Sequence, residues 1–600
     1  MAKRNLFDMI NGYTESGKNS SGKKFYVETV TGSANKISIT RAGKYISKFF
    51  ANLAKVTSYT SSRAYGAFLC VFGALSLAIH FIKDYVGVYD IIPMSVVILC
   101  SSVFVFGIPF LVSDKPLSIA LQNNRLTDFI FFEFFCIRRM HRGENEKGIP
   151  TVVGAVLGVT FAVLGAFVPL WTVVLGLGLA VYIFLTFLSP EFSFFSIFLI
   201  MPYLTFDSDG IFLAGLVAIT LISYARKVSL GKRIYYFEQY DFGLFAMLFC
   251  ILISGIFVKG IESFVSSVVM ILLGMGYVLS SSLVTNRRLA DCLANAVIIS
   301  SVPASVIAIV DSIIDIAKNG IAGFAGASAT FDKPYTLAVF LIVSLAFSSY
   351  FVDARRSHGA KVLYTVITIV NLCALAFTMS IWAFGTLFIG TLAFLVQKMR
   401  YGSGLMLLFL SVFAYGLLFI PSGYLEVLSG NQILRSLGLA DSIERWHTSY
   451  AMLRDNLFLG IGIGEESFAS EIANYSATFD YHNSGNFLLE IACEAGIISL
   501  IVFSCIYLVR VRHRGIYQPY VSHSQVSKIS VYTTVLTVML MAFGAFNYIW
   551  ADMTMYYLFW CVFGLGSATL RVAKQEFDDR AAYFSDGSAE DSSSIDISIR

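Results

Sequence analysis

Residues 151–188 read TVVGAVLGVTFAVLGAFVPLWTVVLGLGLAVYIFLTFL and contain no charged side chain. A helix needs about 20 predominantly apolar residues to cross the hydrocarbon core of a bilayer. The stretch is therefore long enough for two spans, 151–168 and 170–188, although short neighbouring spans between 151 and 225 could also merge or be re-entrant. Because backbone polar groups in lipid have to be satisfied within the protein, we expect helices rather than strands.

Comparable apolar runs recur along the whole chain. Of its 600 residues, 56% are hydrophobic and 14% are charged, whereas soluble domains carry about 25% charged residues. The candidate spans are 66–83, 91–112, 151–168, 170–188, 191–205, 211–225, 242–258, 261–284, 291–311, 335–353, 361–378, 381–397, 404–420, 485–509, 529–546 and 550–571. The predicted fold is an all-α polytopic transmembrane bundle of about 12–16 spans, with one large extracytoplasmic loop between late spans.

Basic residues predict the orientation of these spans. With this count of spans, the basic clusters fall on one side of the membrane: Arg138-Arg139, Arg226-Lys227 with Lys232-Arg233, Arg287-Arg288, Arg355-Arg356, Lys398 with Arg400, and Arg510, Arg512 and Arg514. That side is cytoplasmic by the positive-inside rule, so both termini are expected in the cytoplasm of a multi-pass inner-membrane protein. The formal net charge is only +4 and the basic residues lie mostly in short loops, so nucleic acid is not an expected partner.

The chain then divides into five predicted regions. Residues 1–63 form a basic cytoplasmic tail, expected to be partly disordered with its later half along anionic lipid. Residues 64–420 form a transmembrane bundle with an interfacial segment at 114–150, in which the aromatic run 127–137 is too short to span. Residues 421–484 form the large outer loop, 485–572 the last transmembrane helices, and 573–600 a disordered cytoplasmic tail.

The outer loop limits the candidates for a general base. Of the seven histidines, only His447 and His482 are expected to face outward. Counting in fours from His482 gives Asn486, Glu490 and Glu494, which would share one face of a helix entering the membrane. Ionisable residues there are costly, and a carboxylate near an imidazole fixes its tautomer and raises its basicity. The plainer interpretation is an interfacial histidine followed by glutamates that snorkel.

The same loop carries the arginines that we expect outside, Arg435, Arg445 and Arg454. Guanidinium groups suit phosphate oxygens because they offer paired donors and keep their charge, although each could equally be a solvated cation or contact a lipid headgroup. The glycines of Gly460-Ile461-Gly462-Ile463-Gly464 lack the spacing of a dinucleotide site and indicate a tight turn or a close backbone approach.

In this order, the residues resemble the O-antigen ligase and polysaccharide polymerase superfamily of integral membrane glycosyltransferases. The resemblance is strongest over 441–505, and its elements are Asp441 to Trp446, Met452 to Gly464 (MLRDNLFLGIGIG), His482-Asn483, and Glu490 followed by Glu494-Ala495-Gly496. Thr330-Phe331-Asp332-Lys333-Pro334 is similar to the Thr-Phe-x-Asn-Pro with which the family often begins a span.

The sequence also departs from the family pattern. The spacing from His482 to Glu494 is longer by nearly one helical turn, and Ser380 is followed by Ile381 where the family commonly has Ser-Arg. If that arginine contacts the lipid diphosphate, this chain has to use another cation, such as Lys333 or Arg435.

The resemblance implies a substrate class and a set of roles. Such enzymes transfer a glycan from undecaprenyl diphosphate to an acceptor hydroxyl on a glycan or lipid, at the outer membrane face, with no metal and no cofactor. His482 would accept the proton of the acceptor, Arg445 with Arg454 or Arg435 would stabilise the departing diphosphate, and Glu490 would orient the histidine. The expected substrate-binding residues are Arg454, Arg435, Lys333, Asn483, Asn486, Glu494, Trp446 and Gly462.

Three other interpretations remain open. A multispan transporter or flippase of lipid-linked glycans would place its polar groups in mid-span and use broken helices in repeated halves. A wall glycosyltransferase of the peptidoglycan-polymerase kind normally relies on an outer-loop carboxylate, and a noncatalytic assembly protein would tolerate loss of His482. Within the resembled family the acceptor is undecided between polymerase and ligase, with a slight preference for polymerase; membrane lipids and polysaccharide-assembly proteins are the further partners expected.

Overall fold

The computed structural model describes residues 41–86, 94–135, 137, 148–204, 210–231, 233–237, 239–258, 260–320, 324, 326–355, 357–396, 439–475, 482–522 and 524–587. The regular elements in these ranges are helices, which confirms the predicted all-α fold. Eleven of them are long and apolar enough to cross a membrane, and three shorter apolar helices accompany them within the described residues. The chain is a multi-pass membrane protein. The predicted span at 404–420 lies outside the described residues.

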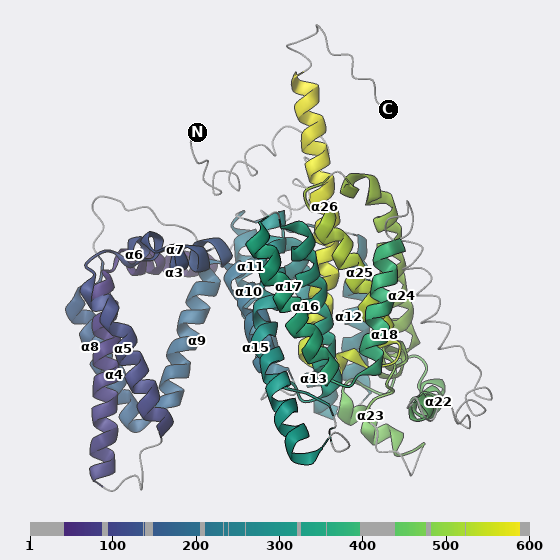
Figure 1. Cartoon of the computed structure of the whole chain (residues 1–600), viewed down its shortest axis with the longest axis horizontal. Coiled ribbons are helices and arrows are strands. Elements are labelled where there is room, and N and C mark those ends of the chain that lie inside the picture. Colours follow the sequence, from purple (N-terminus) through teal and green to yellow (C-terminus); the bar gives the residue numbers. More distant parts are fainter. Residues whose placement is uncertain are drawn as a thin grey trace. The chain divides into compact units, whose positions relative to one another are not determined.

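The chain divides into two compact units, Met1–Phe194 with Ile219–Tyr235, and Phe195–Ala218 with Tyr236–Arg600. Figure 1 labels the helices. Two boundaries between the units fall within α10 (Pro190–Ile200) and α11 (Ile211–Ser229), and the third lies between Tyr235 and Tyr236. The other elements of the first unit are α3 (Arg41–Tyr59), α4 (Ser62–Tyr85), α5 (Met94–Val112), α6 (Leu117–Asn123), α7 (Arg125–Thr127), the π-helix η1 (Asp128–Phe134), α8 (Thr151–Phe167) and α9 (Leu170–Leu188).

The second unit holds most of the predicted site. Its elements are the 3₁₀ turn η2 (Met201–Tyr203), α12 (Gln239–Phe257), α13 (Gly260–Gly274), α14 (Gly276–Leu283), α15 (Arg287–Asn319), α16 (Pro334–Ala354), α17 (His358–Phe377), α18 (Ile381–Val396), α22 (Leu439–Asp455), α23 (Glu465–Ile472), α24 (Phe487–Ser522), α25 (Ser527–Gly544), the 3₁₀ turn η5 (Ile549–Ala551) and α26 (Met553–Gly587).

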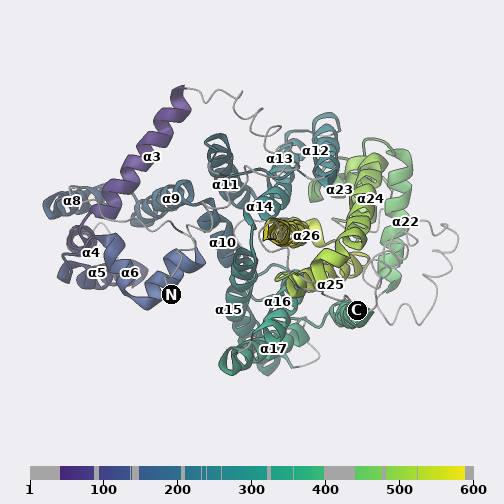
Figure 2. The ribbon, with the colours of Figure 1, turned by 90° about the horizontal axis from the view of Figure 1, so that it is seen from above.

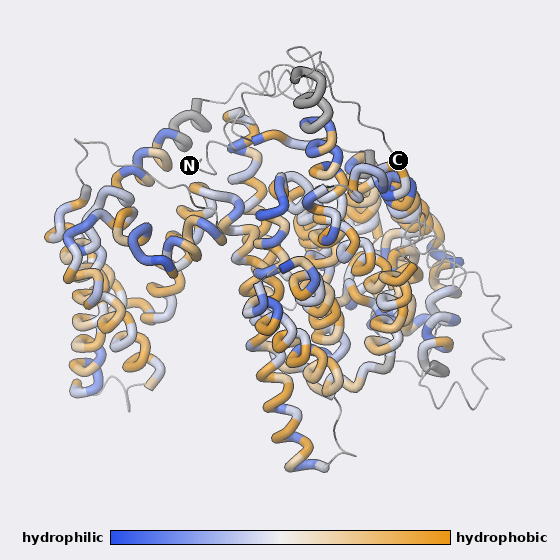
Figure 3. The backbone as a smooth tube through the Cα atoms, turned by 45° about the horizontal axis from the view of Figure 1, so that its top comes forward, coloured by the Kyte–Doolittle hydropathy of each residue, from blue (hydrophilic) through white to orange (hydrophobic). Residues whose placement is uncertain are grey.

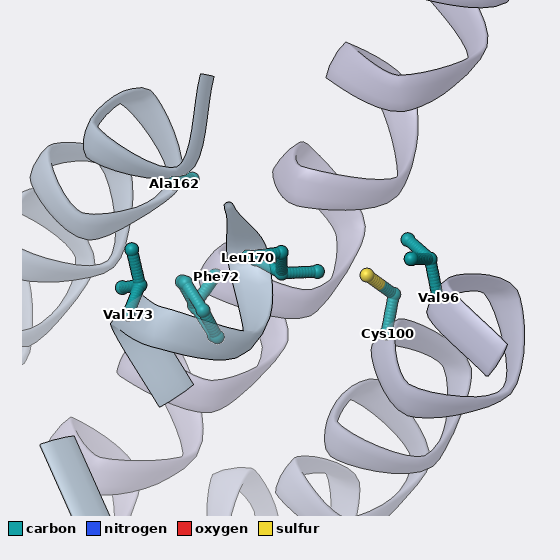
Figure 4. Packing of buried hydrophobic residues seen from close by; sticks show 6 residues of the cluster. All are labelled: Phe72, Val96, Cys100, Ala162, Leu170 and Val173. Carbon is teal, nitrogen blue, oxygen red and sulfur yellow. The ribbon is translucent and has the colours of Figure 1, made fainter. Parts of the chain in front are cut away.

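Small residues set the helix packing of the first unit. A β-carbon at Gly154 would overlap the carbonyl oxygen of Ala64, and one at Gly158 would lie 2.8 Å from that of Phe68, so α8 approaches the backbone of α4 closely. Such contacts are how apolar helices associate where lipid removes the hydrophobic driving force between them. Beside these contacts, side chains of α4, α5, α8 and α9 form a buried cluster of Phe72, Val96, Cys100, Ala162, Leu170 and Val173 (Figure 4).

Helix α26 is the centre of the second unit. In the segment Met553–Asp579, 94% of the most apolar window is buried, and Figure 2 shows this helix surrounded by α13, α14, α16, α24 and α25. Hydrophobic residues predominate along the helices (Figure 3). Because its whole circumference is covered by protein, α26 is an internal helix rather than a lipid-facing one.

A polar network joins α15, α16 and α17 within the same unit. The Asn371 side-chain nitrogen donates to Ser344 Oγ at 2.9 Å and to Ser301 Oγ at 3.2 Å. Ser305 Oγ donates to Asn371 Oδ1 at 2.7 Å. All four side chains are buried, so they bond one another across the helix interfaces where neither water nor lipid could satisfy them.

Two sequence predictions need correction. The tail predicted to be disordered from residue 573 is helical as far as Gly587, because α26 continues beyond its apolar part. The predicted span 291–311 ends too early, since α15 extends to Asn319. The predicted span 261–284 corresponds to one candidate span, Gly260–Leu283, which is built of two helices, α13 and α14, that meet at Met275.

The outer loop is partly folded. Of residues 421–484, 439–455 form α22 and 465–472 belong to α23, whereas 421–438 and 476–481 lie outside the described residues. Figure 1 shows α22 and α23 at the end of the second unit opposite to the one from which α26 emerges. Helix α22 therefore carries Arg445 and Arg454, and the glycine run 460–464 lies between α22 and α23 at this end of the unit.

Candidate functional site

The segment that begins with His482 is a short loop and not the start of a helix. Helix α24 begins at Phe487. The prediction that His482, Asn486, Glu490 and Glu494 share one face of a helix is therefore wrong for His482 and Asn486, which precede the helix. The physical reason is Asn486, whose Oδ1 accepts hydrogen bonds from the amides of Leu488 and Leu489 at 2.9 and 3.1 Å. This is N-cap geometry, which asparagine favours. His482 is exposed and forms no hydrogen bond with the described residues.

Glu490 holds this loop from one side. Its carboxylate is fully buried, and Oε2 accepts a hydrogen bond from the Ser484 amide at 2.6 Å. Its other oxygen, Oε1, has no hydrogen-bond partner among the described residues. Buried oxygens are rarely left without a donor. Glu490 thus holds the loop through Oε2, while Oε1 remains able to accept a further hydrogen bond.

Arg445 lies against the same loop. A β-carbon at Gly485 would be 3.3 Å from Cζ and Nη1 of Arg445, so glycine leaves room for the guanidinium at this position. Arg445 comes from α22, where its Nη2 donates to Ser442 Oγ at 3.4 Å. The neighbouring Trp446 is buried, with its ring 6.3 Å from that of Phe546.

The loop His482–Asn486 is therefore bounded by two of the predicted catalytic side chains. Arg445 contacts Gly485, and Glu490 binds Ser484. Asn483 folds the loop on itself, since its Oδ1 accepts from the Gly485 amide at 3.1 Å. The sequence predicted that Glu490 orients the histidine. In the structure its contact is with the backbone two residues after the histidine.

The glycine run docks on a break in α24. Gly496 has φ 81° and ψ 168°, which interrupts the helix. The carbonyls of Cys493 and Glu494 accept hydrogen bonds from the amides of Ile461 and Gly462, at 2.8 and 3.3 Å. The Glu494 carbonyl also accepts from Ser254 Oγ at 2.7 Å. The amide of the predicted substrate-binding Gly462 is thus occupied by the protein itself.

Glu494 connects this run to a turn before α26. Its Oε1 accepts from the Gly464 amide at 3.1 Å, and its Oε2 from the Tyr548 hydroxyl at 3.0 Å. Burial, and then the charge of Glu494, raise the pKa of Tyr548 well above its usual value, so the phenol remains a donor. Both oxygens of Glu494 are occupied within the protein, whereas Glu490 keeps one oxygen without a partner.

A cavity of about 100 Å³ adjoins Glu465. It is lined by Met201, Leu204, Thr330, Phe331, Asp332, Lys333, Tyr335, Thr336, Glu465, Ala551, Asp552 and Thr554. Lys333 Nζ pairs with Glu465 Oε1 at 3.4 Å. Burial lowers the pKa of Lys333, but the charges of Tyr335 and Glu465 outweigh it, and the net pKa is raised. With three carboxylates and one lysine, the cavity suits a diphosphate poorly.

The remaining predicted cations lie elsewhere. Arg454 is exposed at the end of α22, where its Nε is 3.5 Å from Asp455 Oδ1. Asp455 also accepts from the Tyr475 hydroxyl at 2.9 Å. Arg435 lies outside the described residues. Within the part of the chain that the structure describes, no group of three or more His, Cys, Asp or Glu side chains could hold a metal ion.

No protein-family model and no curated protein sequence matches the chain.

Several residues at this site were missed by the sequence. Tyr548, Ser254 and Asp552 come from segments far from the outer loop, and only folding brings Tyr548 and Ser254 to Glu494. Tyr548 lies between the predicted spans 529–546 and 550–571, and Asp552 is a charged residue at the start of the second of them, which are the signals that could have indicated them. A serine such as Ser254, inside an apolar run, carries no such signal.

Proposed function

We propose that the protein is a membrane glycosyltransferase that moves a glycan from an undecaprenyl-diphosphate carrier to an acceptor hydroxyl at the outer face of the cytoplasmic membrane. The observation that carries the proposal is the loop His482–Asn486, held between Arg445 of α22 and Glu490 of α24. It places the guanidinium of Arg445 against the short loop that carries the exposed imidazole of His482. The carrier and the acceptor class come from the resemblance over 441–505.

The chemistry requires one bond to form and one to break. The acceptor oxygen attacks the anomeric carbon of the donor glycan as His482 takes up the hydroxyl proton, and general-base assistance of this kind contributes about 10²–10⁴-fold. The bond from the anomeric carbon to the diphosphate oxygen breaks, and Arg445 stabilises the negative charge that collects there. Glu490 acts by holding the Ser484 backbone, which sets the position of the loop.

Substitution of His482 tests the catalytic role directly. With purified protein and a lipid-linked oligosaccharide donor, His482→Ala is expected to lower the rate of glycan transfer by about 10²–10⁴-fold. His447→Ala is the matched control, because His447 is also an exposed histidine of the same outer segment and lies on α22. It should keep the rate within about twofold. Near-normal transfer by His482→Ala would remove the histidine from the reaction and end the proposal.

The products distinguish polymerase from ligase. A ladder of lengthening glycans on the carrier indicates polymerisation, whereas a single transfer to a lipid acceptor indicates ligation. We favour polymerisation slightly, because the long tails and the departures from the family pattern fit a divergent protein of a polysaccharide locus.

One observation favours a transporter or flippase instead. Helix α24 is broken at Gly496, next to two buried glutamates, and broken helices form substrate sites in transporters. However, the carbonyls at this break are already bonded by Ile461 and Gly462, which leaves the break closed. Liposomes containing a fluorescent lipid-linked glycan separate the two functions. Protein-dependent flipping that survives His482→Ala, with no new glycosidic bond, would favour the transporter.

A further inference from the structure

The cavity beside Glu465 has a polar lining that no step of the proposed transfer uses. Most of it comes from three segments, which are residues 330–336 at the start of α16, Glu465 at the start of α23, and residues 551–554 at the start of α26. Glu465 follows Gly464, whose amide binds Glu494 at 3.1 Å. The cavity therefore adjoins the docked glycine run, at the end of the second unit that carries α22 and α23 (Figure 1).

Two threonine hydroxyls of the lining have no partner within the described residues. Thr336 on α16 is 2% exposed, and its hydroxyl forms no hydrogen bond with them. Thr330 Oγ1 is buried and also has no partner among them. Buried hydroxyls are rarely left unpaired, because nothing then replaces the hydrogen bonds that water made. A ligand in the cavity would supply the missing partners.

The lining also has carboxylate oxygens that the described part of the chain does not occupy. Asp552 caps α26 through Oδ1, which accepts from the amides of Thr554 and Met555, and Oδ2 has no such bond there. Asp332 is exposed and forms no hydrogen bond or ion pair with the described residues. Lys333, which pairs with Glu465, is the only cation of this lining.

These charges narrow the class of ligand. Three carboxylates repel a phosphate or another carboxylate, and the lysine repels an amine. Among the described residues, no group of three or more His, Cys, Asp or Glu side chains could hold a metal ion. A neutral ligand with several hydroxyl groups suits the lining, because a hydroxyl can donate to a carboxylate and accept from a lysine or a threonine. Sugars are ligands of this kind.

The volume sets how much of a sugar can enter the cavity. A cavity of about 150 Å³ holds a benzene ring, so one of about 100 Å³ takes about four non-hydrogen atoms. That is the size of one vicinal diol, with its two carbons and two oxygens, and less than a whole pyranose ring. Asp332 and Lys333 line the cavity and are exposed, so the cavity opens to solvent and the rest of the ring stays outside.

We propose that this cavity binds one diol edge of a neutral sugar ring, which pairs with the free threonine hydroxyls and with the carboxylates of the lining. The inference rests on the proposed function, because the ring would belong to the glycan that is transferred or extended. The carboxylates repel the diphosphate of the donor. The bound ring is therefore a sugar further along the glycan and not the one attached to the carrier.

Ligand-observed NMR of the purified full-length protein tests the site in the absence of any lipid-linked donor. A detergent without a sugar headgroup is used, and saturation transfer to glucose, galactose and mannose is titrated. The wild type should bind at least one of these hexoses saturably, with the strongest transfer at two adjacent ring protons. Glucuronate has the ring of glucose with an added carboxylate, and should bind about tenfold more weakly because like charges repel. No saturable binding of any hexose, or equal binding of glucose and glucuronate, would overturn the proposal.

Substitutions locate the binding. Thr336→Val keeps the shape of the side chain and should raise the half-saturating hexose concentration about two- to tenfold, since one hydrogen bond to the sugar is lost. The variant should fold as well as the wild type, because the hydroxyl that it loses has no partner in the described protein. Thr330→Val gives a second test of the same kind. Thr386→Val is the matched control, because Thr386 is a buried threonine of α18 outside the lining, and it should leave binding unchanged. Unchanged binding in both Thr336→Val and Thr330→Val contradicts the site.

This site and the proposed function can fail separately. His482→Ala should bind the hexose as the wild type does although transfer is lost, and Thr336→Val should raise the KM for the glycan more than it lowers kcat. Hexose binding that depends on Thr336, in a protein that transfers no glycan, would keep the site and end the proposed function. Glycan transfer by a protein that binds no hexose would end the site alone.

Discussion

Replacing Gly460 by alanine should detach the glycine run from the break in α24. Gly460 has φ 72°, where a β-carbon costs about 1–2 kcal/mol. The same β-carbon would lie 2.5 Å from the Cys493 carbonyl oxygen and would overlap that of Glu494, and both are backbone atoms that cannot move away alone. The hydrogen bonds of these carbonyls with Ile461 and Gly462 would then lengthen or break.

The magnitude follows from what each carbonyl loses. Glu494 keeps the bond from Ser254 Oγ, whereas the Cys493 carbonyl loses the Ile461 amide and is not served by the Ile497 amide, which donates to Leu457. A buried carbonyl left unsatisfied costs about 1–3 kcal/mol. When this cost is added to the backbone strain, the substitution Gly460→Ala should lower the unfolding free energy by about 2–5 kcal/mol.

Gly320→Ala is the matched control. Gly320 has the same φ of 72° but no neighbouring atom within 4 Å of the added carbon, so it should lose only the strain of about 1–2 kcal/mol. Both variants would be unfolded by increasing the fraction of sodium dodecyl sulfate in mixed micelles, with tryptophan fluorescence as the signal. If Gly460→Ala loses no more stability than Gly320→Ala, the docking described for the glycine run does not contribute as we infer.

Three further changes probe other parts of the second unit. Asn486→Ala removes the cap of α24 and the hydrogen bond to the Ala545 carbonyl. It should lower the unfolding free energy by about 1–3 kcal/mol in the same micelle assay, and a loss below about 0.5 kcal/mol would contradict this role. Asn371→Ala should cost about 1–2 kcal/mol, because it removes the hydrogen bonds with Ser301, Ser305 and Ser344, about 0.6 kcal/mol for each partner on another membrane helix. An unchanged stability would show that the network contributes nothing. Burial raises the pKa of the Asp552 carboxyl above its usual 3.8 in spite of hydrogen bonds from Thr554. The folded state therefore holds this proton more tightly than the unfolded state, and the wild type loses stability as the pH rises from 3.8 through the raised pKa. Asp552→Asn keeps the cap of α26 and should lessen that loss of stability. If the stability of the variant and of the wild type fell equally over this pH range, the prediction would be contradicted.

The fold was accessible from sequence because lipid leaves few alternatives to a helix. The predicted span 170–188 has the same bounds as α9, and Pro334 begins α16 one residue before the predicted span. An apolar run without charges can form little else in a bilayer. The same reasoning fails beyond such runs, which is why the helical continuation of α26 past residue 573 was missed.

The candidate site was predicted less completely. The sequence indicated Arg445 and Glu490, and the structure brings both to the loop after His482. It also predicted a regular helix from His482 to Glu494, because a spacing of four residues gives no warning of a cap at Asn486. The break at Gly496 depends on a partner segment about thirty residues earlier, and periodicity within one helix cannot reveal such a contact.

The position of α26 constrains the order of assembly. This internal helix leaves the ribosome after α13, α14, α24 and α25, yet all four pack against it. Until α26 is inserted, the inward faces of the earlier helices have only lipid or one another as neighbours. Insertion of the second unit can therefore proceed span by span, but its interior closes in a single late step. A nascent chain that stops before Met553 would expose that interior to the quality-control proteases of its membrane.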